Sequence, residues 1–304
     1  MKVVVLTGGV GGAKLVLGLC HAVPATDVTA IVNTGDDFVH LGLAISPDID
    51  TLLYTLSGKA NAAQGWGREG ESWGFMAALR ELGGADWFQL GDGDLALHVL
   101  RTAALARGEP LSRIVAGFAR SWGIGPTILP MSDDPVATEI VSDEGVLPFQ
   151  HYFVARRCEP RVSAIRFVGA EQARPAPGVL DAIAAADVIL IAPSNPFLSV
   201  DPLLAVPALR QALVDARAPV IAVSPIVGGT AVKGPTAKLM GELGLEVSAA
   251  SVARHYAGVI DAMLLDERDP PADLPVRTAR ADTLMHSLDD RIRVARAALA
   301  MAGA

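Results

Sequence analysis

Short apolar runs alternate with segments of helical spacing at both ends of the chain. The apolar runs occupy residues 3–6, 28–32, 188–191 and 220–223. Runs of this length, rich in Val, Ile and Leu, are typical of strands that are buried in a parallel sheet. Ala and Leu recur at helical spacing in residues 13–21, 180–186 and 203–214. The pattern predicts an α/β protein with a Rossmann-like, three-layer fold, in which helices cover both faces of a parallel sheet.

The middle of the chain has a different pattern. Residues 72–82 and 95–107 place apolar side chains three and four positions apart, as amphipathic helices do. Around residues 138–165 the pattern changes to short β-like pieces, among them residues 149–154. The predicted organisation is a Rossmann-like nucleotide-binding core of residues 1–46 and 171–304, with a mostly helical insertion of residues 47–170.

Composition excludes several classes of protein. Hydrophobic residues make up 51% of the 304 residues, which is too apolar for a disordered chain. Two cysteines, Cys20 and Cys158, are too few for a disulfide-built domain. The longest uncharged stretch, residues 218–232, is shorter than the roughly 20 apolar residues of a membrane-spanning helix. Because the apolar run after Lys2 is also too short for a signal peptide, we expect a cytoplasmic protein without membrane contact.

The net charge narrows the range of partners. The chain carries a formal charge of −8 at pH 7, and its arginines are scattered rather than gathered in a basic stripe. A nucleic-acid partner is therefore not expected. A small phosphate-bearing substrate remains compatible with this charge, because backbone amides can hold a phosphate.

A glycine-rich loop separates the first predicted strand from the first predicted helix. Residues 7–14 read Thr-Gly-Gly-Val-Gly-Gly-Ala-Lys, and glycines permit close approach of the backbone to a ligand at a helix N-terminus. The candidate phosphate ligands are Gly9, Gly11, Gly12 and Lys14. Neither standard motif is complete, because Lys14 replaces the third glycine of the dinucleotide fingerprint and Ala13 and Leu15 break the P-loop pattern. The alternative is a tight turn whose glycines serve packing alone.

Four closely spaced acidic pairs lie in predicted loops or at element ends. They are Asp36 with Asp37, Asp48 with Asp50, Asp92 with Asp94, and Asp133 with Asp134. Like charges this close repel each other unless a cation or hydrogen-bond donors compensate, and Mg²⁺ binds carboxylate and phosphate oxygens. Each pair alone is better explained by a helix cap or a turn than by a metal, and Asp48 is an example because it follows Pro47 and precedes a predicted helix. With the glycine loop, the pairs suggest metal-assisted phosphoryl transfer.

Further candidates follow the later predicted strands. Ser194 and Asn195 come after the run 188–191, where ligands bind in open α/β sheets, although a proline-flanked turn is an equal alternative. Gly228 and Lys233 belong to a second loop, after the run 220–223.

His98 and Arg101 lie one turn apart on the predicted helix of residues 95–107 and face a similar direction. His98 is a candidate base, and its alternative role is that of a buried structural histidine.

Several segments, in a fixed order along nearly the whole chain, resemble one family. They are residues 8–14, 33–37, 45–51, 90–92, 129–134, 192–196 with 205–207, 224–229 and 281–285. The chain is similar in these segments to the 2-phospho-L-lactate transferases of coenzyme F-420 biosynthesis and to their bacterial phosphoenolpyruvate counterparts.

The resemblance implies a reaction and a set of roles. A phosphorylated three-carbon acid passes from a guanosine diphosphate-linked donor to the ribityl hydroxyl of the deazaflavin Fo, GMP leaves, and Mg²⁺ is required. Asp37 and Asp50 are expected to bind the metal and to be catalytic, with Asp36 and Asp48 as further metal ligands. The expected substrate-binding residues are Gly9, Gly11, Gly12, Lys14, Asn33, Asp92, His98, Arg101, Ser194, Asn195, Gly228 and Lys233. The resemblance also implies a homodimer.

One position departs from the family. Gly93 stands between Asp92 and Asp94, where the family usually has a basic residue. We therefore predict that another cation, Arg101 or Lys233, compensates, or that the substrate differs.

Two other functions compete with the transferase. One is a nucleotide-binding relative without Fo transferase activity, such as a regulator of envelope or sugar metabolism, and residues 46–51 and 129–134 argue against it. The other is a dinucleotide-dependent oxidoreductase, which the incomplete fingerprint and the lack of an acid after residues 28–32 disfavour. The donor acid stays open among phospholactate, phosphoenolpyruvate and 3-phosphoglycerate.

Overall fold

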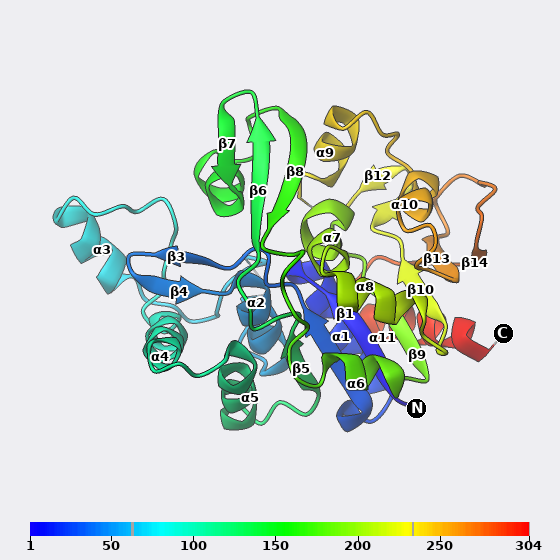
Figure 1. The fold of residues 1–304 in the computed structure, drawn as a ribbon, viewed down its shortest axis with the longest axis horizontal. Coiled ribbons are helices and arrows are strands. Elements are labelled where there is room, and N and C mark those ends of the chain that lie inside the picture. The colour runs from blue at the N-terminus through cyan, green and yellow to red at the C-terminus, as the bar shows by residue number, and fades with distance from the viewer. Residues whose placement is uncertain (62–63, 233, 304) are drawn as a thin grey trace.

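A seven-stranded parallel sheet forms the centre of the molecule (Figure 1). The computed structural model describes residues 1–61, 64–232 and 234–303. The sheet has the order β14-β13-β10-β9-β1-β2-β5. Its strands are β1 (Val3–Thr7), β2 (Val28–Val32), β5 (Thr127–Pro130), β9 (Val188–Ile191), β10 (Val220–Val223), β13 (Ala262–Asp266) and β14 (Arg277–Ala281). The four apolar runs are therefore confirmed as neighbouring central strands, and the Rossmann-like α/β prediction is confirmed.

Both faces of the sheet are buried, because successive side chains of a strand point to opposite faces. Val3 and Val5 of β1 pack with α1 (Gly9–Ala22) and α11 (Leu288–Ala300) on one face. Val4 and Leu6 point to the other face. The helices of the first face also include α2 (Pro47–Leu56) and α5 (Leu111–Ser121). The other face is covered by α6 (Val179–Ala184), α7 (Asp201–Leu204), α8 (Pro207–Val214), α9 (Thr236–Glu242) and α10 (Ala249–His255).

The strand order reverses beside β1. The chain runs from β1 to β2 and β5 on one side, and then returns to place β9, β10, β13 and β14 on the other side. Ligands of open α/β sheets bind at such a reversal, beyond the carboxyl ends of the strands.

Residues 47–170 do not form one insertion, and that prediction is wrong in its limits. β5 lies within this range and pairs with β2 in the main sheet. The chain therefore leaves the sheet twice. The first excursion carries β3 (Phe38–His40), β4 (Leu43–Ile45), α3 (Gly74–Glu81) and α4 (Leu95–Ala106), and the second carries the antiparallel strands β6 (Ala137–Ser142), β7 (Gly145–Pro148) and β8 (Val162–Val168).

Two local predictions also fail. Residues 149–154 are not a strand, because His151–Ala155 form one turn of π-helix in which the amide of Arg156 donates to the carbonyl of His151. The helix predicted over residues 203–214 is broken into α7 and α8, since Pro207 has no N–H to continue a helix and instead begins the next one.

No single helix in the described ranges is long and apolar enough to cross a membrane. Residues Pro196–Leu204 and Pro207–Val214 meet the length and composition test only as a pair, and that pair is bent by 90°.

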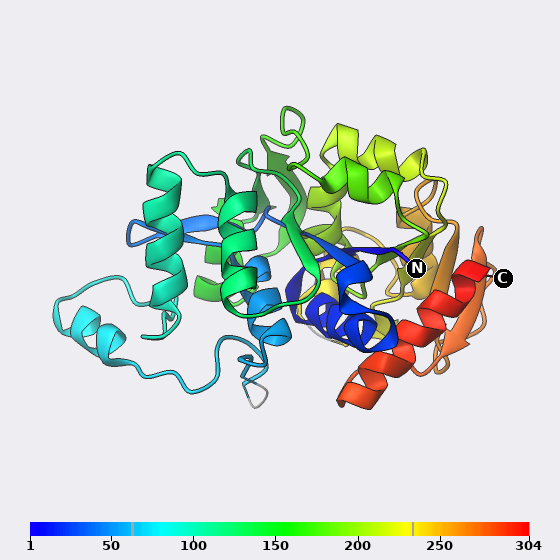
Figure 2. The same ribbon diagram turned by 90° about the horizontal axis from the view of Figure 1, so that it is seen from below.

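Gly18 sets the closest approach of α1 to α11, which lie side by side in Figure 2. A Cβ atom at Gly18 would lie 2.2 Å from the carbonyl oxygen of Arg291. That atom belongs to the backbone and cannot rotate away, so Gly18→Ala should lower the free energy of unfolding by about 1–3 kcal/mol. Urea denaturation measures this loss.

Gly241→Ala in α9 is the matched control, because a Cβ there meets nothing within 4 Å. Replacing a helical glycine without a clash is expected to stabilise the protein by about 0.5–1 kcal/mol. Equal unfolding free energies for the two variants would contradict the tight approach of α1 and α11.

Candidate functional site

A cavity of about 880 Å³ opens at the carboxyl ends of the central strands. Its walls come from the core and from both excursions of the chain. The glycine loop and Lys14 line it, together with Asp36, Asp48 and Asp50. The residues after β9 and β10 and the segment after β14 complete the part of the wall that the core supplies. The cavity therefore lies where the reversal of strand order predicts a ligand.

The glycine loop lines the cavity with Gly9 and Gly11, whereas Gly12 is buried behind it. A Cβ at Gly12 would lie 2.1 Å from Thr7 Oγ1, and one at Gly11 would lie 2.8 Å from the carbonyl oxygen of Pro193. Packing alone thus requires these two glycines. The N-cap Gly8 offers no side chain to the first turn of α1; the Gly9 amide donates to Asp48, and the following amides of that turn are available to an anion.

Asp48 ties the glycine loop to the start of α2 instead of capping that helix. Ser46 is the N-cap, and the Asp48 carboxylate accepts hydrogen bonds from the Gly9 amide (2.7 Å) and from Asn33 Nδ2 (2.9 Å). Burial raises the pKa of Asp48 to about 6, although the bonds from Asn33 and Gly9 oppose that shift. Asn33 itself is fully buried and is not among the residues that line the cavity, so its substrate contact stays a prediction. Its role is to hold Asp48.

Asp36 and Asp37 carry the carboxylate oxygens that lack partners. One oxygen of each is buried without a hydrogen bond to any described residue. Burial raises the pKa of both groups well above the ordinary value, and the charge of Asp48 adds to the shift at Asp36. Asp36 lines the cavity, whereas Asp37 lies beside it and accepts a hydrogen bond from Ser46 Oγ at 2.7 Å. Clustered carboxylates with unpaired oxygens fit a divalent cation.

The metal site is not complete in the protein alone. Within residues 1–61, 64–232 and 234–303, no three His, Cys, Asp or Glu side chains are grouped as a ready-made metal site. Mg²⁺ characteristically uses one or two carboxylates and takes its other oxygens from phosphate and water. The carboxylates therefore fit Mg²⁺ together with a phosphate-bearing substrate.

Asp50 is held by a buried ion pair between α2 and α4. Both of its oxygens accept hydrogen bonds from Arg101, which is fully buried and does not line the cavity. The guanidinium group of Arg101 is committed to Asp50, and its substrate contact stays a prediction. Burial alone would lower the pKa of Arg101. The charge of Asp50, its hydrogen bonds to the guanidinium group and the charge of Asp37 together outweigh burial, so the pKa is raised above its ordinary value.

His98 lines the cavity beside this pair, as a substrate-binding role requires. Its Nδ1 lies 3.7 Å from Asp50 Oδ2, and its Nε2 lies 3.2 Å from Asp94 Oδ2. Tyr54 donates its hydroxyl to Asp94 and also lines the cavity. Tyr54 is not among the predicted site residues, although its position four residues after Asp50 on one helix places both on one face.

Asp92 and Asp133 cap helices, as the alternative interpretation of the acidic pairs proposes. The Asp92 carboxylate accepts from Ser72 Oγ and from the amides of Gly74 and Phe75 at the start of α3. These bonds, that from Ser72 foremost, lower the pKa of Asp92. Asp133 accepts from the amide and hydroxyl of Ser112 in the first turn of α5. Asp92 is not among the residues that line the cavity, and its substrate contact stays a prediction.

Arg68 occupies the space next to Gly93. A Cβ at Gly93 would lie 2.4 Å from Arg68 Nη1, and Arg68 is paired with Glu71, which also accepts from the Gly93 amide. A cation therefore lies beside this position although the residue itself is glycine. Arg101 does not compensate as predicted, and Lys233 lies outside the described residues.

Ser194 and Asn195 line the cavity beyond β9, as predicted. Ser194 donates its hydroxyl to the carbonyl of Gly8 at 2.8 Å, which joins this loop to the glycine loop. Asn195 Oδ1 accepts from the amides of Phe197 and Leu198, so the turn interpretation is also correct. The Nδ2 group of Asn195 is buried without a partner in the described chain and is available as a donor to a ligand.

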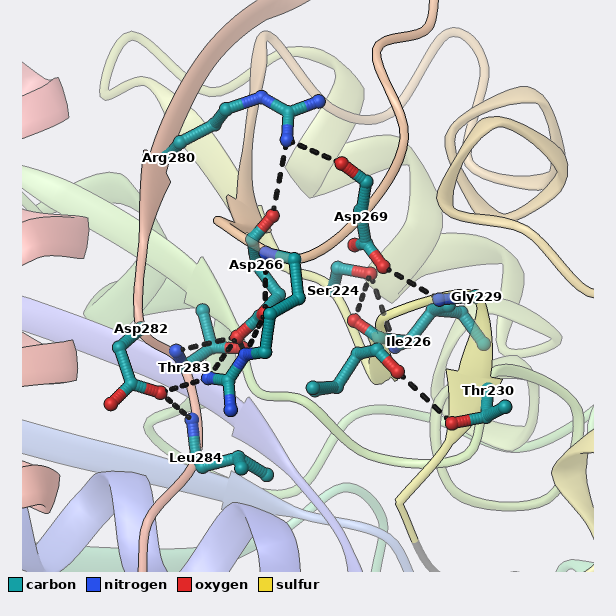
Figure 3. Close-up of polar contacts among 12 residues, drawn as sticks. Ser224, Ile226, Gly229, Thr230, Asp266, Asp269, Arg280, Asp282, Thr283 and Leu284 are labelled. Carbon is teal, nitrogen blue, oxygen red and sulfur yellow. Dashed lines mark hydrogen bonds and ion pairs between the residues drawn. The ribbon is translucent and has the colours of Figure 1, made fainter.

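The loops after β10 and β14 form a further wall. Gly228 and Gly229 turn the short hairpin of β11 (Ile226–Val227) and β12 (Thr230–Ala231), both with positive φ. Val227 lines the cavity in place of the predicted Gly228. Residues 283–286, which the sequence analysis did not assign to the site, lie on the same wall. Figure 3 shows the polar contacts that join these loops.

An aromatic wall was also missed. Its members are Tyr54, Trp66, Phe88, Phe149 and Phe153. Only 5% of the residues are aromatic, so the gathering of five around one cavity points to a planar ligand. They come from distant parts of both excursions, and no spacing along the sequence connects them.

Comparisons with known proteins bear on the family and the fold of this chain. The family model described as 2-phospho-L-lactate transferase CofD matches residues 3–302. The phosphoenolpyruvate transferase of Streptomyces coelicolor is 45% identical, over 99% of this chain and 98% of that protein. The 2-phospho-L-lactate transferase of Methanosarcina mazei is 38% identical, over 94% of this chain and 95% of that protein.

The fold has a counterpart among solved structures. The crystal structure of a UPF0052-family protein from Bacillus halodurans superimposes with a TM-score of 0.65, at 18% identity and over 98% of both chains. That likeness concerns the fold alone. The sequence comparisons go further and show that the chain belongs to the 2-phospho-L-lactate transferase family, the transferases of coenzyme F-420 biosynthesis.

Proposed function

We propose that the protein transfers a phosphorylated three-carbon acid from a guanosine diphosphate-linked donor to the deazaflavin Fo and releases GMP. The observation that carries this proposal is the composition of one cavity. Its wall combines the first turn of α1, the Asp36 carboxylate with an unpaired oxygen, and five aromatic side chains, and Asp37 lies beside it with a second unpaired oxygen. A diphosphate, a divalent cation and a planar ring system are the ligands that these three groups suit.

The donor is proposed to bind on the core side of the cavity. Amides in the first turn of α1 point to the phosphates, where the positive end of the helix dipole favours an anion. The unpartnered Nδ2 of Asn195 donates to the same nucleotide. Met285 accepts a hydrogen bond from Lys14 Nζ at 2.7 Å, which keeps this lysine at the cavity wall.

Fo is proposed to bind against the aromatic wall, where Phe88, Phe149 and Phe153 offer surface to its ring system. Asp50 lines the same cavity and is fixed by Arg101, so its carboxylate is positioned to orient the attacking hydroxyl. Holding both reactants in one geometry supplies a large part of the rate of such a transfer.

Asp36 and Asp37 are the proposed magnesium ligands. Each has an unpaired carboxylate oxygen, whereas the oxygens of Asp48 and Asp50 already accept hydrogen bonds from named donors. A bound Mg²⁺ offsets the charge that develops on the transferred phosphoryl group. The protein contributes the cluster of carboxylates and the amide groups around them.

A transfer assay tests the proposal. Fo, Mg²⁺ and each of three guanylylated acids, derived from phosphoenolpyruvate, phospholactate and 3-phosphoglycerate, are incubated with the protein, and products are identified by mass spectrometry. The phosphoenolpyruvyl product is expected to dominate, because identity to the Streptomyces coelicolor phosphoenolpyruvate transferase exceeds identity to the Methanosarcina mazei enzyme. GMP should appear in equal amount.

Reactions without Fo serve as the control and should release no GMP. Binding of GDP without any Fo-linked product would reject the transferase and favour the nucleotide-binding relative. A dominant phospholactyl product would keep the reaction and overturn the proposed donor.

A further inference from the structure

Two walls of the cavity are joined through the turn that follows β13. One wall is the segment of residues 283–286, and the other is the β11–β12 hairpin. Asp266, at the end of β13, is fully buried and accepts hydrogen bonds from the amide and hydroxyl of Thr283, both at 2.9 Å. Arg268 donates to the same carboxylate and also pairs with Asp282. The turn is thus firmly attached to the segment after β14.

Asp269 attaches the same turn to the hairpin. Its Oδ1 accepts a hydrogen bond from the Gly229 amide at 3.1 Å, and the residue is only 5% exposed. Its carbonyl oxygen accepts from Arg280 Nη1 at 2.7 Å, so β14 holds the turn from the other side (Figure 3). The carboxylate therefore presents a fixed acceptor to the hairpin.

The hairpin is very short: Ile226 at its start is buried in the core and donates its amide to Ser224 Oγ, and the contact with Asp269 holds the glycine turn. Each strand has two residues, and isolated two-stranded hairpins are marginally stable in water. Its two-glycine turn is conformationally free in the unfolded chain. Thr230 adds a bond from Oγ1 to the carbonyl of Val227, but that bond lies within the hairpin and does not attach it to the core.

We propose that Asp269 is a positioning residue for the donor side of the cavity, which it controls by holding the β11–β12 hairpin at its Gly229 amide. Neither Asp266 nor Asp269 lines the cavity, whereas Val227 of the hairpin does. The carboxylate thus acts through the backbone of the hairpin. The inference rests on the proposed function, because that function assigns the core side of the cavity to the guanosine diphosphate-linked donor.

The test compares Asp269→Ala with Asp269→Asn. Asparagine keeps an Oδ1 acceptor for the Gly229 amide, and alanine removes it. Because one hydrogen bond is at stake, Asp269→Ala should weaken GDP binding and raise the donor KM by about three- to tenfold. The Fo KM and kcat should stay within about twofold of wild type, as a role confined to positioning the donor side requires. Asp269→Asn should restore the donor KM.

Hydrogen exchange of residues 226–231 supplies a readout that does not depend on activity. Exchange should be faster in Asp269→Ala than in wild type and near wild type in Asp269→Asn, because local opening of the hairpin becomes easier. Asp273→Ala, at an exposed aspartate shortly after the turn, is the control and should change neither exchange nor KM.

The possible results separate the inference from the proposed function. Equal losses in the KM for the donor and for Fo, or no rescue by Asp269→Asn, would show a general structural defect and overturn the positioning role. If wild-type protein does not bind GDP, the proposed function fails. In that case unchanged exchange in Asp269→Ala overturns the inference, and faster exchange with rescue by Asp269→Asn supports control of the hairpin by Asp269.

Discussion

Replacing Arg101 with Leu is expected to lower the free energy of unfolding by about 3–5 kcal/mol, because it leaves the charge of Asp50 buried without its partner. Arg101 is 0% exposed and Asp50 is 5% exposed, so water cannot replace the lost guanidinium group. Turnover should fall as well, since Arg101 holds both oxygens of Asp50 at the cavity wall. Urea denaturation at pH 7.5 measures the first effect, and the transfer assay measures the second.

A double variant separates loss of the pair from loss of packing. Asp50→Asn with Arg101→Leu removes the buried charge, so its unfolding free energy should exceed that of Arg101→Leu alone. The matched surface control is Arg107→Leu, whose pair with Glu109 has side chains 63% and 37% exposed and should contribute no more than about 1 kcal/mol. If Arg101→Leu lowers the free energy of unfolding no more than Arg107→Leu does, the buried pair of Arg101 and Asp50 does not stabilise the protein as proposed.

The central sheet was predictable because its strands are buried on both faces. Every residue of β1, β9 and β10 is buried, so each appears in the sequence as a continuous apolar run. β5 was missed because it lies at the edge of the sheet, where only Ile128 and Pro130 of its four residues are buried. An edge strand of this kind has no continuous apolar run, and the limits of the insertion were wrong for that reason.

The candidate site was predictable in part. Gly9, Asp48 and Ser194 were identified because their motifs lie directly after strands or at helix starts, and such positions meet at one edge of a parallel sheet. Tyr54 and the aromatic wall were not identified, because side chains that meet from distant segments produce no recognisable motif in the sequence. Arg101 was assigned to substrate because the sequence does not show that it is buried against Asp50.

The spacing of acidic residues in the sequence does not show whether a carboxylate caps a helix or lies unpaired at the cavity. Asp92 and Asp36 both belong to a closely spaced pair in a loop, yet Asp92 caps α3 while Asp36 keeps an unpaired oxygen at the cavity. The difference arises from whether a helix N-terminus or other carboxylates lie opposite the side chain. The groups that lie opposite a carboxylate are set by the fold, and aspartate can serve either as a helix cap or as a metal ligand.

Asp36→Asn is expected to stabilise the protein without metal at neutral pH and yet to reduce turnover by about 100-fold or more. The pKa of Asp36 is raised well above the ordinary value of 3.8, mainly by burial and then by the charge of Asp48. The folded protein therefore binds a proton more tightly than the unfolded chain does at this carboxyl. The contribution of Asp36 to stability is fully present below pH 3.8 and is lost as the pH rises through the folded pKa. Asparagine carries no charge and escapes that loss.

Thermal unfolding from pH 4 to pH 8 in EDTA measures the sign of this effect. The midpoint of Asp36→Asn should exceed that of wild type by a margin that grows with pH, because the unfolded wild-type chain releases the Asp36 proton at a lower pH than the folded protein does. Adding Mg²⁺ with GDP should narrow the margin, since a bound cation stabilises the charged carboxylates of the wild-type protein alone. Asp273→Asn, at an exposed aspartate, should show no such trend. If Asp36→Asn is less stable than wild type at pH 8, or keeps full turnover, Asp36 is not a ligand of the proposed magnesium site. Asp37 would then be the remaining candidate ligand with an unpaired carboxylate oxygen.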